Sequence, residues 1–311
     1  MTAMIWRLHR RQVAFATASF AALAIVLMIT GLRMHGDYSD ALATCGAAHS
    51  CGDLSSELFQ GDGLIIDLVL ATMAVPLLLG MFWGVPIVAR EIEEGTQDLA
   101  WTQSVTRRQW LSSNVTAVVL AAATWGAGLA VLVTWWCGPE NALNGRLSSG
   151  RFDVQALVPV AYSVFAVALG LAAGTWFRRV LPALATTLGV FVVVRVVTLQ
   201  WVRPHYLSPI RRTFPLVNNS WGAPPGSWIV SRDVIDRFGH IVTKQGAAFA
   251  PCTNSLTVSV TCMARLGYRR LVVFQPAHRF WTFQLIEAAI FALLAAVLVG
   301  LAFWRCLHSD A

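Results

Sequence analysis

Six stretches of this chain are apolar over about 20 residues or more, the length that a helix needs to cross a bilayer. They cover residues 13–33, 64–89, 110–136, 154–176, 180–201 and 281–304. Charged residues make up only 13% of the chain, against about 25% in a typical soluble domain. We therefore expect an all-α polytopic membrane protein with six transmembrane helices.

The arginines predict the orientation of these helices. With the N-terminus inside, the short inside segments hold nine arginines, whereas the short outside loops hold only Arg146 and Arg151, with Arg33 at a helix edge. Basic residues concentrate in short cytoplasmic loops, so we expect both termini in the cytoplasm and the protein in the cell membrane. Residues 1–12 mix arginines with apolar residues, which fits either a helix in the membrane interface or a basic tail that only sets topology.

The formal net charge of +7 raises the question of a nucleic-acid partner. The basic residues gather at the ends of the apolar stretches and not along one face, which argues against nucleic acid. Membrane lipid is the partner that this distribution favours.

Residues 202–280 separate the last two apolar stretches and are too many for a structureless loop. Short strands are indicated at 228–230, 234–235 and 241–243, the last two on either side of a turn at 238–240. We expect a small external domain with some β-structure at 202–280. It would follow an N-terminal interfacial helix and transmembrane helices 1–5 at 1–201, and precede the last helix and cytoplasmic tail at 281–311.

Four of the six cysteines lie on the predicted outside, where disulfides form. Local pairs, Cys45 with Cys51 and Cys252 with Cys262, are the simplest arrangement, and pairing between the loop and the domain stays open. Cys45, His49 and Cys51 also have the chemistry of metal ligands, but their spacing and compartment favour a disulfide. We expect no metal site.

Three ionisable residues interrupt the apolar stretches in the outer half of the membrane: Asp67, Arg195 and Glu287. A charge inside the bilayer is costly, so such groups usually pair or line water. We hypothesise that Arg195 pairs with Asp67 or Glu287 beside an outward-facing cavity. The alternative is that each side chain reaches the interface independently.

A polar segment, residues 90–109, lies between the second and third apolar stretches on the predicted inside. Its first half carries four acids, Glu91, Glu93, Glu94 and Asp98, and Arg107 and Arg108 precede the next apolar stretch. The segment is either a contact for a soluble partner or a solvated hairpin. The sequence contains no Walker A, His-Glu-x-x-His or Gly-x-Ser-x-Gly motif, so we expect no enzyme and no energy source within the chain.

Several of these features resemble the permease subunit of an ABC-2 type transporter. Members carry an Arg-Glu…Glu-Gly-Thr run between helices two and three, here residues 90–96 with Gly95 and Thr96, and then a Ser-x-Thr/Ser-Arg segment, here Ser104 to Arg107. Residues 274–287, at the start of the last helix, look like those of actinobacterial members. The large external segment departs from the simplest members.

The resemblance implies that a separate ABC ATPase subunit docks on residues 91–108 and binds ATP and Mg²⁺, with no cofactor on this chain. It also implies a second permease copy, most simply in a homodimer. A short helix from Thr96 to Gln103 would enter the ATPase, with the acids meeting basic groups and with Leu99 and Trp101 as apolar anchors. Trp101 could equally be a residue of the interfacial aromatic belt.

The function that follows from the resemblance is ATP-driven export of an apolar or amphipathic compound, such as an antibiotic, a drug or a lipid. The alternative is a membrane sensor or scaffold without transport activity, whose external domain binds a ligand.

Overall fold

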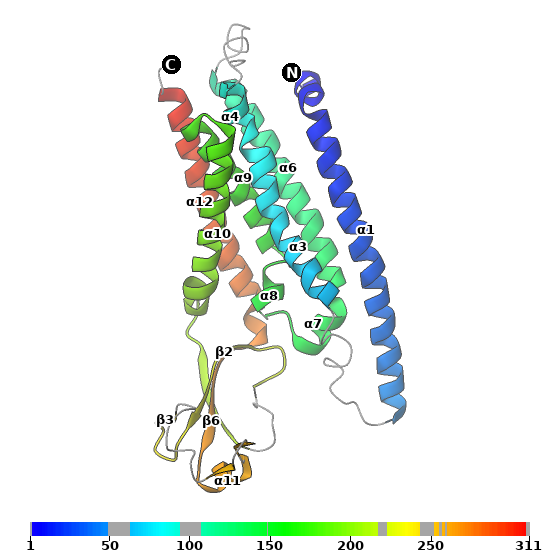
Figure 1. The fold of residues 1–311 in the computed structure, drawn as a ribbon, viewed down its shortest axis with the longest axis vertical. Coiled ribbons are helices and arrows are strands. Elements are labelled where there is room, and N and C mark those ends of the chain that lie inside the picture. Colours follow the sequence, from blue (N-terminus) through cyan, green and yellow to red (C-terminus); the bar gives the residue numbers. More distant parts are fainter. Residues whose placement is uncertain are drawn as a thin grey trace.

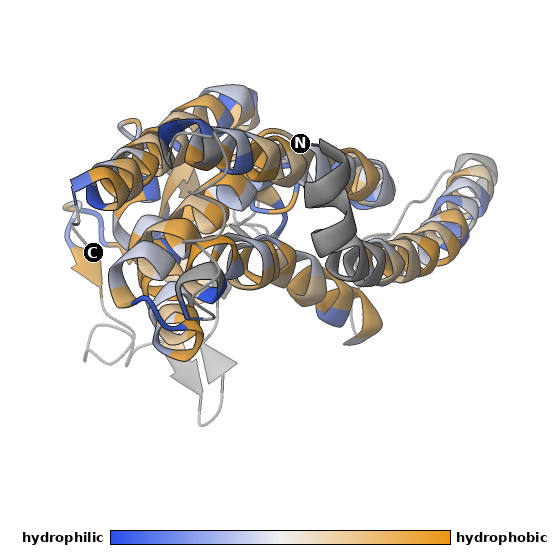
Figure 2. Ribbon diagram, turned by 90° about the horizontal axis from the view of Figure 1, so that it is seen from above, coloured by the Kyte–Doolittle hydropathy of each residue, from blue (hydrophilic) through white to orange (hydrophobic). Residues whose placement is uncertain are grey.

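The fold is described from a computed structural model. It describes residues 2–48, 63–93, 107–147, 149–216, 223–242, 252–254, 257–258 and 260–308. Six helical runs in this part of the chain are long and apolar enough to cross a membrane: Thr17–Cys45, Gly63–Arg90, Leu111–Trp136, Val158–Phe177, Val180–His205 and Ala277–His308. Their number and approximate positions agree with the sequence-based prediction. Large apolar side chains on the outer surface include Leu181, Val131 and Leu293, and hydrophobic colour covers much of the bundle seen from above (Figure 2).

The first helix differs from the prediction. α1 runs without a break from Thr2 to Ala48, so residues 2–12 do not form a separate interfacial helix but extend the first span. At 1.5 Å per residue a helix of this length is about 70 Å long, more than twice the thickness of the hydrocarbon core. α1 lies at the side of the bundle (Figure 1) and packs on α6 (Arg107–Trp136) through Leu27, Leu129 and Val133.

The second span is divided by a wider turn. α3 (Gly63–Leu79) passes into a π-helical turn, η1 (Gly80–Gly84), and then into α4 (Pro86–Glu93). Pro86, at the start of α4, has no backbone N–H to donate. A π-turn just before it is a known local departure from regular α-helical hydrogen bonding. This turn brings the backbone of Gly80 and Gly84 against α9 (Val158–Phe177), where Gly170 faces both.

α9 is the central helix of the bundle. In its most apolar window 83% of the residues are buried, against 17–28% in the other five spans. It packs against α6, α3, α4, α10 (Val180–Val197) and α12 (Phe280–His308). α10 continues through a π-turn, η2 (Thr198–Val202), and a 3₁₀ turn, η3 (Arg203–His205). The helical run therefore extends beyond residue 201, where the sequence analysis ended it.

Between α6 and α9 the chain makes two short helices, α7 (Gly138–Asn144) and α8 (Ser149–Phe152). The residues after α8 are buried, including Asp153 at 5% exposure and Gln155 at 0%. This connection therefore packs into the bundle, at the end that faces the β-sheet (Figure 1).

The predicted external domain contains a four-stranded antiparallel sheet in the order β1-β6-β2-β3. The strands are β1 (Ile210–Pro215), β2 (Trp228–Ile235), β3 (Ile241–Val242) and β6 (Arg269–Gln275). A second pair, β4 (Thr253–Asn254) and β5 (Thr257–Val258), precedes the short helix α11 (Val260–Arg265). The predicted segments at 228–230 and 234–235 form one strand, β2, which pairs with β3 as expected, whereas the central strand β6 and its neighbour β1 were not predicted.

The sheet is connected to the bundle by short segments. β1 follows η3 at the end of the α10 helical run, and β6 leads through η5 (Ala277–Arg279) into α12. It lies at one end of the molecule, and both chain termini lie at the other (Figure 1). Cys252 and Cys262 form the predicted disulfide. Cys45 is also disulfide-bonded, and its predicted partner Cys51 lies outside the described residues.

Candidate functional site

Four charged side chains meet inside the bundle in the half nearer the sheet. We call Asp153, Arg195, Arg203 and Glu287 the charge cluster; they come from the turn after α8, from α10, from η3 and from α12. Arg203 donates two hydrogen bonds to Glu287, from Nε to Oε2 at 2.9 Å and from Nη2 to Oε1 at 2.6 Å. Arg203 also pairs with Asp153. Such a bidentate contact is the strongest form of arginine–carboxylate pair.

Arg195 completes the charge balance of the cluster. Its Nη2 lies 3.2 Å from Asp153 Oδ2, and its Nη1 lies 3.7 Å from Glu287 Oε1. The four side chains are 0–3% exposed, apart from Arg195 at 16%. With two positive and two negative groups the formal charge is zero, which is the condition under which ions are tolerated in an apolar interior.

Three aromatic residues line the charge cluster: Tyr162, Tyr206 and Phe152. Tyr162 donates a hydrogen bond to Glu287, and Tyr206 Oη donates to Glu287 Oε2 at 3.1 Å. The guanidinium of Arg195 lies 3.7 Å above the Tyr162 ring, and that of Arg203 lies 4.5 Å above the Phe152 ring. These cation–π contacts hold both arginines where water is scarce.

Gln284, one turn before Glu287 on α12, fixes the segment that carries Asp153. Its Oε1 accepts hydrogen bonds from the backbone N–H groups of Leu157 and Val158 at 3.1 and 3.0 Å, and its Nε2 donates to Phe152 O at 3.0 Å. The first N–H groups of a helix have no partner within it. Gln284 thus caps α9 from a neighbouring helix and joins α8, α9 and α12 at one point.

The structure brings Arg195 and Glu287 together, as hypothesised, but not Asp67. Asp67 is exposed on α3 and makes no ion pair within the described residues. Asp153 and Arg203 were missed, because each lies just outside a predicted span. Arg203 is eight residues after Arg195, a spacing about 80° out of register in a regular α-helix. The π-turn η2 accommodates one extra residue and restores both arginines to one face.

One nitrogen of each arginine, Nη1 of Arg195 and of Arg203, is buried without a hydrogen-bond acceptor in the described part of the chain. Each arginine is therefore ion-paired, but not all of its N–H groups have a hydrogen-bond acceptor among the described residues. The described residues also contain no cluster of His, Cys, Asp and Glu that could hold a metal ion. The arrangement joins the connection after α8, the α10 helical run and α12 through buried ion pairs.

The opposite end of α10 carries a second contact. Oε2 of Glu93, the last residue of α4, accepts a hydrogen bond from the backbone N–H of Val180, the first residue of α10, at 3.0 Å. A carboxylate at a helix N-terminus stabilises it by hydrogen bonding and by the helix dipole. Beneath this contact Ala89 of α4, Ala173 of α9 and Ala183 of α10 pack in one buried cluster with Val85. Glu93 thus ties α4 to the start of α10.

Residues 91–108, predicted to contact an ATPase, lie only partly within the described residues. Glu91 lies in α4 and Arg107 begins α6, with side chains outside the description. The remaining residues predicted to contact a partner lie outside the described residues: Glu94, Gly95, Thr96, Asp98, Leu99 and Trp101. The last turn of α4 and the first turn of α6 lie at the same end of the bundle as both termini (Figure 1).

Comparison with known proteins gives one family. The family model described as "ABC-2 membrane transporter related" matches residues 17–203. The match covers the first five spans, including Glu93, Asp153 and Arg195, and ends at Arg203; it does not cover the sheet or α12. No curated protein and no solved structure matches the chain.

Proposed function

Because the chain belongs to the ABC-2 membrane transporter related family, and is therefore a multi-pass membrane transport component, we propose that it is the permease subunit of an ATP-driven exporter in the cell membrane. A separate ABC ATPase docks on residues 91–108 at the cytoplasmic face, where both termini lie, and binds ATP and Mg²⁺. Two copies of the chain form the path for an apolar or amphipathic compound.

The observation that carries this proposal is the position of α10 between two polar contacts. At one end Glu93, from the proposed docking segment, caps the helix at Val180. Towards the other end Arg195 and Arg203 join Asp153 and Glu287 in the charge cluster. A shift of the docking segment therefore acts on a rigid helix whose far end holds the outer half of the bundle together.

The mechanism is a displacement of packed helices. Closure of the two ATPases pulls on residues 91–108 and moves α4. The alanine contacts and Glu93 pass this movement to α10. Movement of α10 separates its arginines from Glu287 on α12, so the outer half of the bundle opens. ATP binding supplies the free energy needed to part buried ion pairs, which each cost several kcal/mol when left alone (about 3–5 kcal/mol).

Co-purification tests the docking role. The tagged protein should retain an ABC ATPase from its native membrane, and the purified complex should hydrolyse ATP. Charge reversal at Glu93 and Glu94 together, each to Arg, should abolish retention without loss of membrane insertion. Asp40→Arg, a reversal on an exposed residue of α1 near the other face, is the control and should retain the ATPase.

Normal retention by the double variant would contradict docking on this segment. If the unaltered protein retains no ATPase at all, the sensor or scaffold function becomes the better explanation.

Glu93→Gln separates docking from transmission. Glutamine keeps the shape but removes the charge that favours the α10 N-terminus. We expect the ATPase to stay bound, while ATP changes the separation of α10 and α12 less than in the unaltered complex. Spin labels replacing Trp201 and Trp281, which are 64% and 54% exposed, report this separation as the distance between the labels, measured by double electron–electron resonance. If ATP changed this distance as much in the variant as in the parent, Glu93 would not be part of the transmission from the docking segment to α10.

A further inference from the structure

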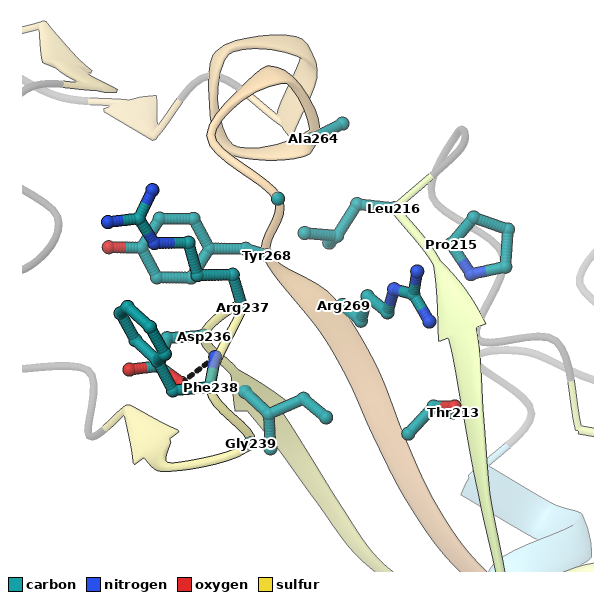
Figure 3. A pocket seen from close by; sticks show the side chains of 12 residues that line it. Thr213, Pro215, Leu216, Asp236, Arg237, Phe238, Gly239, Ala264, Tyr268 and Arg269 are labelled. Atoms are coloured by element: carbon teal, nitrogen blue, oxygen red, sulfur yellow. Dashed lines mark hydrogen bonds between the residues drawn. The ribbon is translucent and has the colours of Figure 1, made fainter.

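The membrane-distal end of the sheet contains a cavity of about 610 Å³ that the transport proposal does not use. It opens where β1 and β2 end and β6 begins. Figure 3 shows Arg237, Phe238 and Tyr268 on one side of it and Pro215, Leu216 and Arg269 on the other. The volume falls within the range of pockets that hold small organic molecules.

The polar lining of the cavity is cationic. Neither Arg237 nor Arg269 forms an ion pair in the described part of the chain. The one acidic residue in the lining, Asp236, is already engaged in its own turn: Oδ1 accepts from the backbone N–H groups of Phe238 and His240 at 2.8 and 2.9 Å, and Oδ2 lies 3.4 Å from His240 Nδ1. The hydrogen bond from the backbone of His240, with that from Phe238, lowers the pKa of Asp236 below its ordinary value. The two guanidinium groups are therefore available to an external anion.

The apolar lining includes two aromatic rings. Phe238, at the turn between β2 and β3, is 71% exposed, although an aromatic ring of this kind usually finds cover. The guanidinium of Arg237 lies 4.7 Å from the centre of that ring, which places a positive group and an apolar face side by side. Tyr268 adds a second ring from the start of β6. A ligand with a flat apolar body and an acidic group would satisfy both features.

The charge of the whole external segment points to the same ligand class. Residues 202–280 contain ten Lys and Arg residues against two Asp and no Glu, a formal charge of +8. The rest of the chain is close to neutral, since the total is +7. A domain with this field attracts anions from solution and raises their local concentration.

The distance from the bundle favours a ligand that arrives from water. The cavity lies at the Arg269 end of β6, and seven residues of extended strand separate it from η5 and α12. At about 3.3 Å per residue this is roughly 20 Å. A lipid held in the bilayer would not reach the cavity without leaving the membrane.

We propose that this cavity binds a water-soluble organic anion with an aromatic ring, held by Arg237 and Arg269 and stacked against Phe238. The carboxylate or other acidic group takes charge-assisted hydrogen bonds from either guanidinium group, and the one on the opposite side of the cavity adds to its attraction by charge. The site does not depend on the export role, because binding requires only the external domain in the intact protein.

Equilibrium dialysis with the full-length protein in nanodiscs of zwitterionic lipid tests the site. The probe is 2-naphthoate, and 2-naphthylmethanol serves as its neutral counterpart, with empty nanodiscs as background. We expect saturable binding of one naphthoate per chain and at least tenfold weaker binding of the alcohol. Arg237→Gln and Arg269→Gln should each weaken naphthoate binding about tenfold or more, as expected for the loss of a charge-assisted hydrogen bond.

The matched control is Arg212→Gln, the same change on β1 at a position one residue before Thr213 and hence on the opposite face of the sheet. This variant should bind naphthoate with the affinity of the parent. Phe238→Ala should weaken binding of naphthoate but not of acetate. Three results would overturn the proposal: no saturable binding above empty nanodiscs, undiminished binding by the Arg237→Gln, Arg269→Gln double variant, or an equal loss in Arg212→Gln, which would indicate non-specific attraction.

Discussion

Glu287 is the residue on which most of the buried polar contacts converge. It is 0% exposed and accepts hydrogen bonds from Arg203, Tyr162 and Tyr206. These donors depend on one buried carboxylate as their acceptor. Its removal leaves charges and hydroxyls without acceptors in a region where water does not replace them.

We predict that Glu287→Gln destabilises the protein by about 3–5 kcal/mol, the usual cost of removing one partner from a buried ion pair. Two arginines would then face Asp153 alone. Thermal unfolding of the detergent-solubilised protein measures the effect as a lowered transition temperature.

Two further variants sharpen that prediction. Asp67→Asn is the matched control, because Asp67 is exposed on α3 and unpaired within the described residues; it should change stability by less than about 0.5 kcal/mol. Replacement of Glu287 and Arg203 together by Leu removes the uncompensated charge and should recover more than half of the loss. A double variant no more stable than Glu287→Gln would show that the pair does more than balance charge.

Among the elements, α9 and the divided second span depend most on small residues. A Cβ at Gly170 would meet the backbone of Gly80 and Val85. The same two helices meet again at Gly174, where a Cβ would contact Val85 and Ala89. Membrane helices approach closely where glycine and alanine face each other, so the contact between α9 and the second span is a backbone-to-backbone contact.

Gly170→Ala is predicted to destabilise the bundle by roughly 1–3 kcal/mol, the cost of overpacking a close contact. Gly189 on α10 has open space around its Cβ position, so Gly189→Ala should be neutral or stabilise the helix by up to about 1 kcal/mol. Thermal unfolding of both variants in one detergent gives the comparison. Equal effects from the two substitutions would contradict the packing described for η1 and α9.

The whole molecule places the basic sheet at one end of the helical bundle and both termini at the other (Figure 1). Short connections through η2 and η3 between α10 and β1, and through η5 between β6 and α12, join the sheet to the two helices that share the charge cluster. Gln275 reinforces this junction by donating to Leu207 O at 2.7 Å. The sheet and the outer half of the bundle therefore form one continuous unit.

The orientation predicted from the arginines has a direct test at this scale. In a protein with Cys137 and Cys306 replaced by Ser, Phe238→Cys should react with a membrane-impermeant maleimide added to intact cells. Leu307→Cys, exposed near the end of α12, should react only after the cells are made permeable. The reverse pattern would place the polar segment 90–109 outside and exclude ATPase docking there.

The sequence alone determined the six spans, because crossing a bilayer depends on the local length of an apolar stretch and on little else. It also indicated β2, its turn and β3, which are adjacent in the chain, and it indicated Arg195 and Glu287 because a charge in an apolar stretch requires a partner. Only the tertiary structure decided which partners they have. Asp153 and Arg203 enter the cluster through a buried connection and a π-turn, β1 and β6 pair across more than fifty residues, and the external cavity forms where three strands meet. Each of these depends on contacts between distant segments, whose free energy no local pattern of residues records.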